Sequence, residues 1–294
     1  MSKHKLSRKA FEIAYREEFY EIHSDSPLSL ALRTIIDDRG IYRITIVDTA
    51  RTVRGVLSGL RILEILSGHR GESIKKRTSK GFVTLLEEPV HLFVESYLHK
   101  LSKNISLKGL ISYIMENSVG HVVLVDQMNR LQGIITESCI LKRLKVEDIK
   151  IKISDIMTQR VYSVTTENTL LDSITMMAKH NIRRMPVFYN SKFKGMVTVT
   201  DLIKHLCSSL QSNEDLEEEK IKKLLQEPIS RIDFKQPKIL HPNEKLNAQN
   251  LDEFGLGYLI LEDDHKIVGI ASPRDLVTKV PILIGVQNFI QLIR

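Results

Sequence analysis

The sequence lacks several features that would point directly to a function class. It contains no tryptophan, and aromatic residues make up only 6% of its 294 residues, which disfavours a stacking platform for single-stranded nucleic acid. Two cysteines, Cys139 and Cys207, are too few for a disulfide framework. No apolar run approaches the roughly 18 residues of a membrane helix, and residues 1–9 hold no apolar segment of a secretion signal. We therefore expect a cytoplasmic protein with no membrane partner.

The charge balance favours anionic partners. Hydrophobic residues make up 42% and charged residues 27% of the chain, as in packed globular proteins. Lys and Arg number 43 against 36 Asp and Glu, a formal net charge of +7, which bears on partners and not on fold. Phosphate ligands, acidic proteins and nucleic acids all remain candidates. Basic segments at residues 3–9 and 75–80 are the candidate surface for nucleic acid.

An internal repeat organises the whole chain. Four segments share an apolar strand, a polar turn, a glycine, two apolar residues and then Ser or Thr, with the glycines at Gly55, Gly133, Gly195 and Gly269. An alternating strand and a stretch with helical apolar spacing precede these segments, and the Ser or Thr opens a further helix. The pattern predicts four β-α-β-β-α repeats at about residues 10–70, 83–146, 150–211 and 224–285.

A longer period groups the repeats in pairs. Leu85–Val90 before the second repeat recurs as Leu224–Ile229 before the fourth, and their prolines, Pro89 and Pro228, lie 139 residues apart. The glycines of the first and third repeats are 140 residues apart. One repeat of about 60 residues buries too little surface to be robust alone. The sequence therefore predicts an α/β fold of two domains, residues 1–146 and 147–294, each a pseudo-two-fold pair of repeats.

The third repeat carries the motifs of a known family. It contains Met157-Thr158, Arg183-Arg184-Met185-Pro186-Val187 and Gly195-Met196-Val197-Thr198-Val199-Thr200-Asp201. These segments resemble the CBS domain, the cystathionine-β-synthase type. The resemblance extends to the fourth repeat and, more weakly, to the first two, which implies a stand-alone protein of two tandem Bateman modules. Such modules bind AMP, ADP, ATP or S-adenosylmethionine between paired repeats, usually as sensors, and some copies have no known ligand.

The candidate binding sites lie where the third and fourth repeats pass from strand to helix. Thr198 and Ser272 are each followed three residues later by a carboxylate, Asp201 and Asp275, which is the pattern of a capping box. A helix N-terminus also suits phosphate, and a carboxylate can accept hydrogen bonds from both hydroxyls of a ribose. The resemblance implies that Asp201 and Asp275 hold ribose, with Thr198 and Ser272 beside the sugar-phosphate. Capping and nucleotide binding are compatible.

The first two repeats depart from this motif. Arg61 and Cys139 stand at the aspartate position, and neither can accept a ribose diol as a carboxylate does. We therefore expect the N-terminal pair of repeats to serve as a scaffold or a dimerisation surface.

Basic residues before the middle strands are the candidate phosphate contacts. The guanidinium groups of Arg183 and Arg184 can bind phosphate bidentately. The resemblance implies that they reach a ligand held by Ser272 and Asp275, with Arg274 adding charge, whereas the Asp201 site faces Tyr258, which is no cation. We therefore expect the Asp275 site to tolerate more phosphate charge than the Asp201 site. A solvated arginine pair is the alternative.

Four further residues complete the candidate site. Thr165 and His241 follow the first strands of their repeats, where the resemblance implies contacts with base and ribose. Met185 and Pro186 lie in a middle strand, where backbone groups and apolar side chains such as Met185 and Val187 would recognise adenine. A polar residue that ends a strand also needs no ligand to explain it, and an apolar residue in such a strand is equally a core residue.

No motif for catalysis accompanies these candidates. The sequence has no Walker-type glycine loop, zinc-spaced Cys/His cluster or His-Glu-x-x-His run. We therefore predict a noncatalytic regulatory protein that requires no cofactor, binds an adenine nucleotide as a regulatory ligand in its C-terminal pair, forms a homodimer and signals to an effector protein. The alternatives are a nucleic-acid-binding protein, an enzyme that acts on a nucleotide, and a ligand-free CBS scaffold that mediates oligomerisation.

Overall fold

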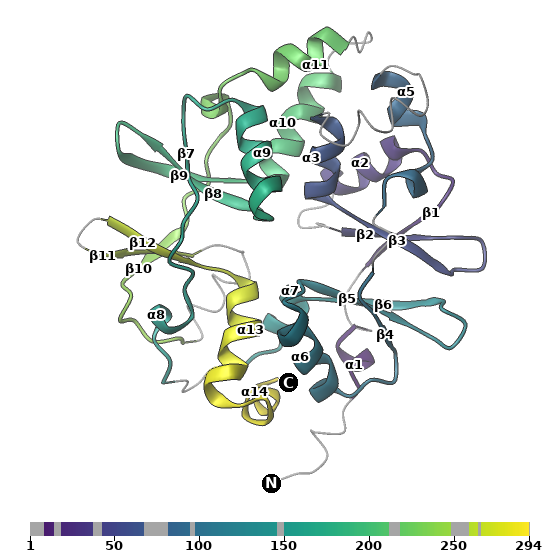
Figure 1. Cartoon of the computed structure of the whole chain (residues 1–294), viewed down its shortest axis with the longest axis vertical. Coiled ribbons are helices and arrows are strands. Elements are labelled where there is room, and N and C mark those ends of the chain that lie inside the picture. Colours follow the sequence, from purple (N-terminus) through teal and green to yellow (C-terminus); the bar gives the residue numbers. More distant parts are fainter. Residues whose placement is uncertain are drawn as a thin grey trace. The chain divides into compact units, whose positions relative to one another are not determined.

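Four small sheets dominate the chain in the computed structural model, which describes residues 9–14, 19–37, 43–67, 82–94, 98–145, 150–211, 218–247, 259–263 and 266–293 (Figure 1). In each sheet the first strand is parallel to the second and the third is antiparallel to it. The strands are β1 (Tyr20–His23), β2 (Arg43–Val47), β3 (Val53–Ser58), β4 (Lys100–Ser102), β5 (His121–Val125), β6 (Leu131–Thr136), β7 (Val164–Thr165), β8 (Arg184–Tyr189), β9 (Lys192–Thr198), β10 (Lys238–Leu240), β11 (Leu259–Asp263) and β12 (Lys266–Ala271).

Helices alternate with these strands in the predicted order. They are α1 (Phe11–Ala14), α2 (Leu28–Asp37), α3 (Gly59–Leu66), α5 (Phe82–Glu87), η1 (Val90–Leu92), α6 (Leu107–Asn117), α7 (Glu137–Leu141), α8 (Ile153–Ile156), α9 (Leu170–His180), α10 (Val199–Gln211), α11 (Glu218–Leu225), η2 (Ile229–Arg231), α13 (Pro273–Ile284) and α14 (Val286–Leu292). The β-α-β-β-α repeat is confirmed in full three times. In the fourth repeat the helix before β11 falls on residues outside the described ones. Within the described residues, no helix has the length and apolarity to cross a membrane.

The chain divides into two compact units that are not its consecutive halves. The first comprises Met1–Phe19, Leu98–Val161 and Pro237–Arg294, and the second comprises Tyr20–Tyr97 and Tyr162–Gln236. One hydrophobic core therefore joins the second and fourth repeats, and another joins the first and third. Each compact unit thus takes one repeat from each predicted domain. The pairing of consecutive repeats into residues 1–146 and 147–294 stays a prediction.

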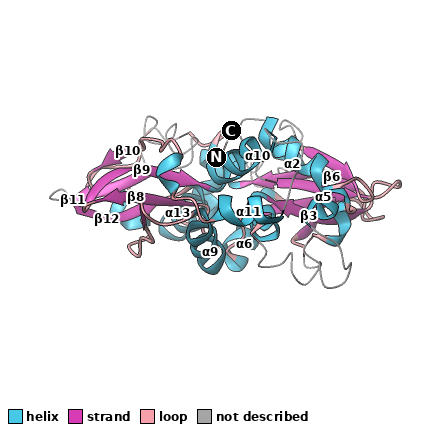
Figure 2. Ribbon diagram, turned by 90° about the horizontal axis from the view of Figure 1, so that it is seen from above, coloured by secondary structure: helices cyan, strands magenta, loops and turns pink. Residues whose placement is uncertain are grey.

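Helices from two repeats pack together inside each compact unit. In the second unit α3 packs against α9 and α10, and in the first unit α13 packs against α6 and α7; the sheets of each unit lie on either side of its helices (Figures 1 and 2). Gly59 permits the approach of α3 to α10, since a Cβ there would lie 3.0 Å from Cγ1 of Val199. The expected homodimer stays a prediction, and these helical faces already have partners within the chain.

A short leader segment precedes the first strand of each repeat and packs on a different repeat. We define the leaders as residues 10–14, 90–94, 153–158 and 229–235. Their side chains lie over the repeat glycines: Ala14 over Gly133, Val94 over Gly55, Met157 over Gly269 and Phe234 over Gly195. A Cβ on Gly133 would lie 2.9 Å from Cβ of Ala14, and one on Gly195 would lie 2.7 Å from Cβ of Phe234. The four glycines that define the repeat therefore mark the positions where the leaders pack.

We predict that Gly195→Ala destabilises the second compact unit. Gly195 has a φ of +141°, and its added Cβ would lie 2.7 Å from Cβ of Phe234 and 2.9 Å from the carbonyl oxygen of Lys235. Backbone strain of this kind costs about 1–3 kcal/mol, and the clash with the leader adds to it. We expect the free energy of unfolding, measured by urea denaturation, to fall by at least about 2 kcal/mol.

Gly285→Ala is the matched control for this substitution. Gly285 also has a positive φ, +84°, but nothing lies within 4 Å of an added Cβ. It should therefore show the cost of strain alone. Equal losses for the two variants would contradict the role of the leader contact.

Candidate functional site

The fourth repeat ends in a capped strand-to-helix junction at the start of α13. The hydroxyl of Ser272 accepts a hydrogen bond from the backbone N–H of Asp275. In return, Oδ2 of Asp275 accepts from the backbone N–H of Ser272 at 2.9 Å and from its hydroxyl at 2.5 Å. The capping box predicted from the sequence is therefore present, with Pro273 at the first helical position.

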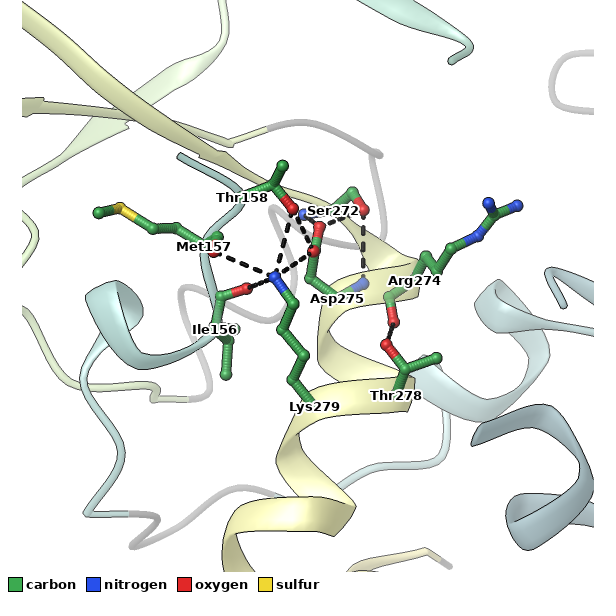
Figure 3. Close-up of polar contacts among 8 residues, drawn as sticks. All are labelled: Ile156, Met157, Thr158, Ser272, Arg274, Asp275, Thr278 and Lys279. Carbon is green, nitrogen blue, oxygen red and sulfur yellow. Dashed lines mark hydrogen bonds and ion pairs between the residues drawn. The ribbon is translucent and has the colours of Figure 1, made fainter. Parts of the chain in front are cut away.

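The third leader encloses the other oxygen of this carboxylate (Figure 3). Oδ1 of Asp275 accepts from the hydroxyl of Thr158 at 2.7 Å and pairs with Nζ of Lys279 at 2.8 Å. Lys279 also donates to the carbonyls of Ile156 and Met157, at 2.8 and 3.0 Å. Asp275 is only 8% exposed as a result. Lys279 therefore connects α13 to the third leader, just at the end of α8.

The third repeat ends in a junction of the same design. Oδ2 of Asp201 accepts from the backbone N–H of Thr198 at 2.9 Å and from its hydroxyl at 2.6 Å. Oδ1 of Asp201 pairs with Nζ of Lys235 at 2.7 Å. Lys235 belongs to the fourth leader, whose backbone exchanges two hydrogen bonds with Met196 in β9. Both predicted ribose carboxylates therefore already contact a cation of this chain.

Lys279, Lys235 and Thr158 are not among the site residues predicted from the sequence. The spacing of Asp275 and Lys279 is i,i+4 on a helix, which is a readable signal for an ion pair. Thr158 stands in the motif that leads the third repeat, but its partner Asp275 is 117 residues away. No local pattern connects Lys235 to Asp201. The leaders supply these partners, and their packing is not visible in the sequence.

The predicted phosphate contacts lie at the entrance of β8. Arg184 is the first residue of β8 and lies opposite Thr198 in the register of β9, and the carbonyl of Arg183 accepts from the backbone N–H of Val199. Met185 is fully buried in the core of the second compact unit, and Pro186 pairs in register with Met196. The predicted reach of Arg183 and Arg184 to Asp275 connects the two compact units and stays a prediction.

Arg274 points away from Asp275 (Figure 3). Its Nε donates to Oε1 of Glu137 at 3.3 Å. Glu137 begins α7 in the second repeat and is only 4% exposed. The pair therefore joins the helices of the second and fourth repeats inside the first compact unit. The phosphate role of Arg274 stays a prediction.

Thr165 and His241 close the turns after their strands. Thr165 donates through its backbone N–H and its hydroxyl to Oδ1 of Asn168, and Nδ1 of His241 accepts from the backbone N–H of Asn243 at 3.2 Å. These bonds explain both polar residues without a ligand, and their ligand contacts stay predictions. Tyr258 and the basic residues 3–8 and 75–80 lie outside the described residues.

Comparison with known proteins identifies the repeat. The family model of the CBS domain matches residues 96–146 and 153–208, which are the second and third repeats. The second and third repeats are therefore CBS domains. The second CBS repeat is matched although Cys139 replaces the carboxylate at its junction, so the family pattern does not depend on that residue.

Two archaeal relatives align with most of this chain. A 33.4 kDa protein encoded in a ribosomal RNA operon of Thermofilum pendens is 24% identical over 263 residues, 87% of this chain and 82% of the relative. Protein MJ1225 of Methanocaldococcus jannaschii, proposed to be an archaeal homologue of g-AMPK, is 24% identical over 209 residues, 70% of this chain and 74% of its own. The crystal structure of MJ1225 matches with a TM-score of 0.79 at 21% identity, covering 92% of this chain and 99% of that chain.

A second solved structure supports the same fold. A conserved protein from Pyrococcus horikoshii matches with a TM-score of 0.55 at 15% identity, covering 92% of this chain and 98% of that chain. At such identities the likeness concerns the fold and not the ligands.

The first two CBS repeats present other groups at the aspartate position. Arg61 is buried on α3 and pairs with Glu64 at 3.1 Å. Cys139 is buried on α7, and its carbonyl accepts from Arg143.

Among the described residues, no group of three His, Cys, Asp or Glu side chains could hold a metal ion.

We predict that Cys207 resists thiol reagents in the folded protein. Burial raises the pKa of its thiol to about 11, and the thiolate is the reactive form. Labelling of Cys207 with 5,5′-dithiobis(2-nitrobenzoate) at about pH 8 should therefore be slow until the protein unfolds. The same holds for Cys139, which is also buried. Fast labelling of one thiol per chain in native buffer, assigned with Cys207→Ser, would contradict this.

We predict that the pair of Arg274 and Glu137 stabilises the contact between the second and fourth CBS repeats. Arg274→Met leaves a buried carboxylate without this cation, and we expect a loss of about 1–2 kcal/mol in the free energy of unfolding, because Arg274 itself is partly exposed. The same substitution should cost less in a Glu137→Gln background, as a double-mutant cycle would measure.

Arg231→Met is the control for the removal of an arginine. Arg231 lies 3.6 Å from Glu227 in an exposed pair, so its loss should cost no more than about 0.5 kcal/mol. Comparable losses in the free energy of unfolding for Arg274→Met and Arg231→Met would contradict a larger contribution from the pair of Arg274 and Glu137.

Proposed function

We propose that the chain is a noncatalytic regulatory protein that binds an adenine nucleotide, or a related adenosyl compound, at the junctions of its third and fourth CBS repeats. One observation carries the proposal. Two of the four repeats place a carboxylate, Asp201 or Asp275, at the capped N-terminus of a helix directly after the glycine strand. This group can accept both hydroxyls of a ribose, and the free N–H groups of the helix favour a phosphate beside it.

The remaining contacts of the ligand follow from the family resemblance. Arg183 and Arg184 would meet the phosphates of a ligand at Asp275. Thr165 and His241 would lie beside the base and ribose, and Tyr258 would face a ligand at Asp201. The net charge of +7 suits a ligand with several phosphates. AMP, ADP, ATP and S-adenosylmethionine are the candidates.

The regulatory role follows from binding without a catalytic constellation. A ligand shifts a protein only as far as it prefers one of its states, and an effector protein or a second copy of the chain would respond to that shift. The similarity of fold to MJ1225, itself proposed to be a homologue of g-AMPK, supports such a role by analogy.

Calorimetric titration tests the proposal directly. We expect at least one of AMP, ADP, ATP and S-adenosylmethionine to bind the intact chain. The double variant Asp201→Ala/Asp275→Ala should bind it at least about tenfold more weakly, because each lost charge-assisted contact is worth roughly 1.5–3 kcal/mol.

Asp172→Ala is the matched control for the double variant. Asp172 caps α9 with the same geometry, accepting from the backbone N–H of Thr169 at 2.9 Å, but it lies outside both junctions. Its loss should leave affinity unchanged. The proposal fails if no candidate binds the wild type, or if binding survives in the double variant.

A further inference from the structure

The two junction carboxylates differ in how much of their hydrogen-bonding capacity the chain already uses. A carboxylate offers about four lone-pair positions. At Asp275, Oδ2 accepts from the N–H and hydroxyl of Ser272, and Oδ1 accepts from Thr158 and Lys279 (Figure 3). All four positions are filled. Neither hydroxyl of a ribose can bind there unless a group of the chain leaves.

Asp201 has one position to spare. Its Oδ2 accepts from the N–H and hydroxyl of Thr198, and its Oδ1 pairs with Lys235. Among the described residues, no further hydrogen bond to this carboxylate is present. One ribose hydroxyl can therefore bind before any group of the chain moves.

The lysines at the two sites also differ in what they hold. Lys279 is 35% exposed and donates to two leader carbonyls besides Asp275. Thr158 is held in turn by two backbone hydrogen bonds with Ile270. Lys235 is 46% exposed, and its backbone, through Met196, attaches the fourth leader. The backbone bonds of Lys235 do not involve its ammonium, whereas the ammonium of Lys279 joins Asp275 to two carbonyls of the third leader.

On the basis of the proposed function, we propose that Asp201 is the carboxylate that takes the first adenosyl ligand, and that Thr158 and Lys279 mask Asp275. A ribose at Asp275 replaces hydrogen bonds one for one, so it gains little and bears the cost of moving Thr158 or Lys279. This order of filling is opposite to the one that Arg183, Arg184 and Arg274 alone would favour. Their positive charge would attract phosphate to Asp275, but a ribose cannot bind there while Thr158 and Lys279 occupy the carboxylate. Lys279 and Thr158 are thus the residues that decide which site fills.

Counting binding sites by calorimetry tests whether Thr158 and Lys279 prevent a ligand from binding at Asp275; we call this effect the mask. With ATP and AMP as probes, the wild type should show one binding event per chain, and Asp201→Ala should weaken that event at least about tenfold. Lys279→Met and Thr158→Val each remove one occupant of Asp275 and should raise the number of events from one to two. Adding Asp275→Ala to Lys279→Met should remove the second event only.

Lys235→Met is the matched control. It removes the corresponding lysine at the other junction and should alter the affinity of the first event while leaving the number of events at one. Thr158→Val deletes only a hydroxyl and serves if Lys279→Met unfolds.

The outcomes separate this inference from the proposed function. A first event that survives Asp201→Ala but is lost with Asp275→Ala, or two equal events in the wild type, overturns the mask and leaves nucleotide binding intact. A single event in both Lys279→Met and Thr158→Val also overturns it. No binding by any variant overturns the proposed function and the mask with it.

Discussion

A glycine in the last strand of each repeat leaves room for one side chain of a leader, and the rest of the structure depends on this contact. Ala14, Val94, Met157 and Phe234 occupy the four positions. A close-packed interior has no space for an additional Cβ, so the leader and the strand can meet only where the side chain is absent. Each sheet has only three strands, and the leader gives it a packing partner outside its own repeat. The contact joins each small sheet to a segment that is distant along the chain.

The same contact determines the chemistry of the two junctions. The residue that covers the glycine is followed directly by the one that reaches the carboxylate: Met157 by Thr158, and Phe234 by Lys235. The position of the leader and the occupancy of the aspartate are therefore linked by a single step of the backbone. An adenosyl ligand at Asp275 would compete with Thr158 of the third leader, and this is a physical route from binding to a change in the chain.

Helix packing within the compact units gives the four repeats a second set of constraints. The first repeat meets the third through α3, α9 and α10, and the second meets the fourth through α6, α7 and α13. Within the first compact unit, Arg274 and Glu137 form an ion pair across two of these helices. A helix that begins at a candidate site thus also forms part of the contact between repeats, so a rearrangement at Asp275 can reach the second repeat through α13.

Much of the fold was readable from local patterns. The order of strand, helix, glycine and Ser or Thr recurs within windows of a few dozen residues, and it predicted the repeat, its three-stranded sheet and the capping boxes at Asp201 and Asp275. These features arise from backbone periodicity and from hydrogen bonds between neighbours three residues apart. Turn closure at Thr165 and His241 belongs to the same local class.

Only the tertiary structure decided which repeats share a core and which groups surround the carboxylates. The cores join the first repeat to the third and the second to the fourth, while the pairing of consecutive repeats stays a prediction. Thr158 and Lys279 meet at Asp275 although Thr158 is 117 residues from it. Such a contact depends on how leaders pack over glycines, a matter of shape between distant segments that no local pattern encodes. The sequence by itself determined the repeat and its junctions, and the packing of the leaders decided what those junctions are free to bind.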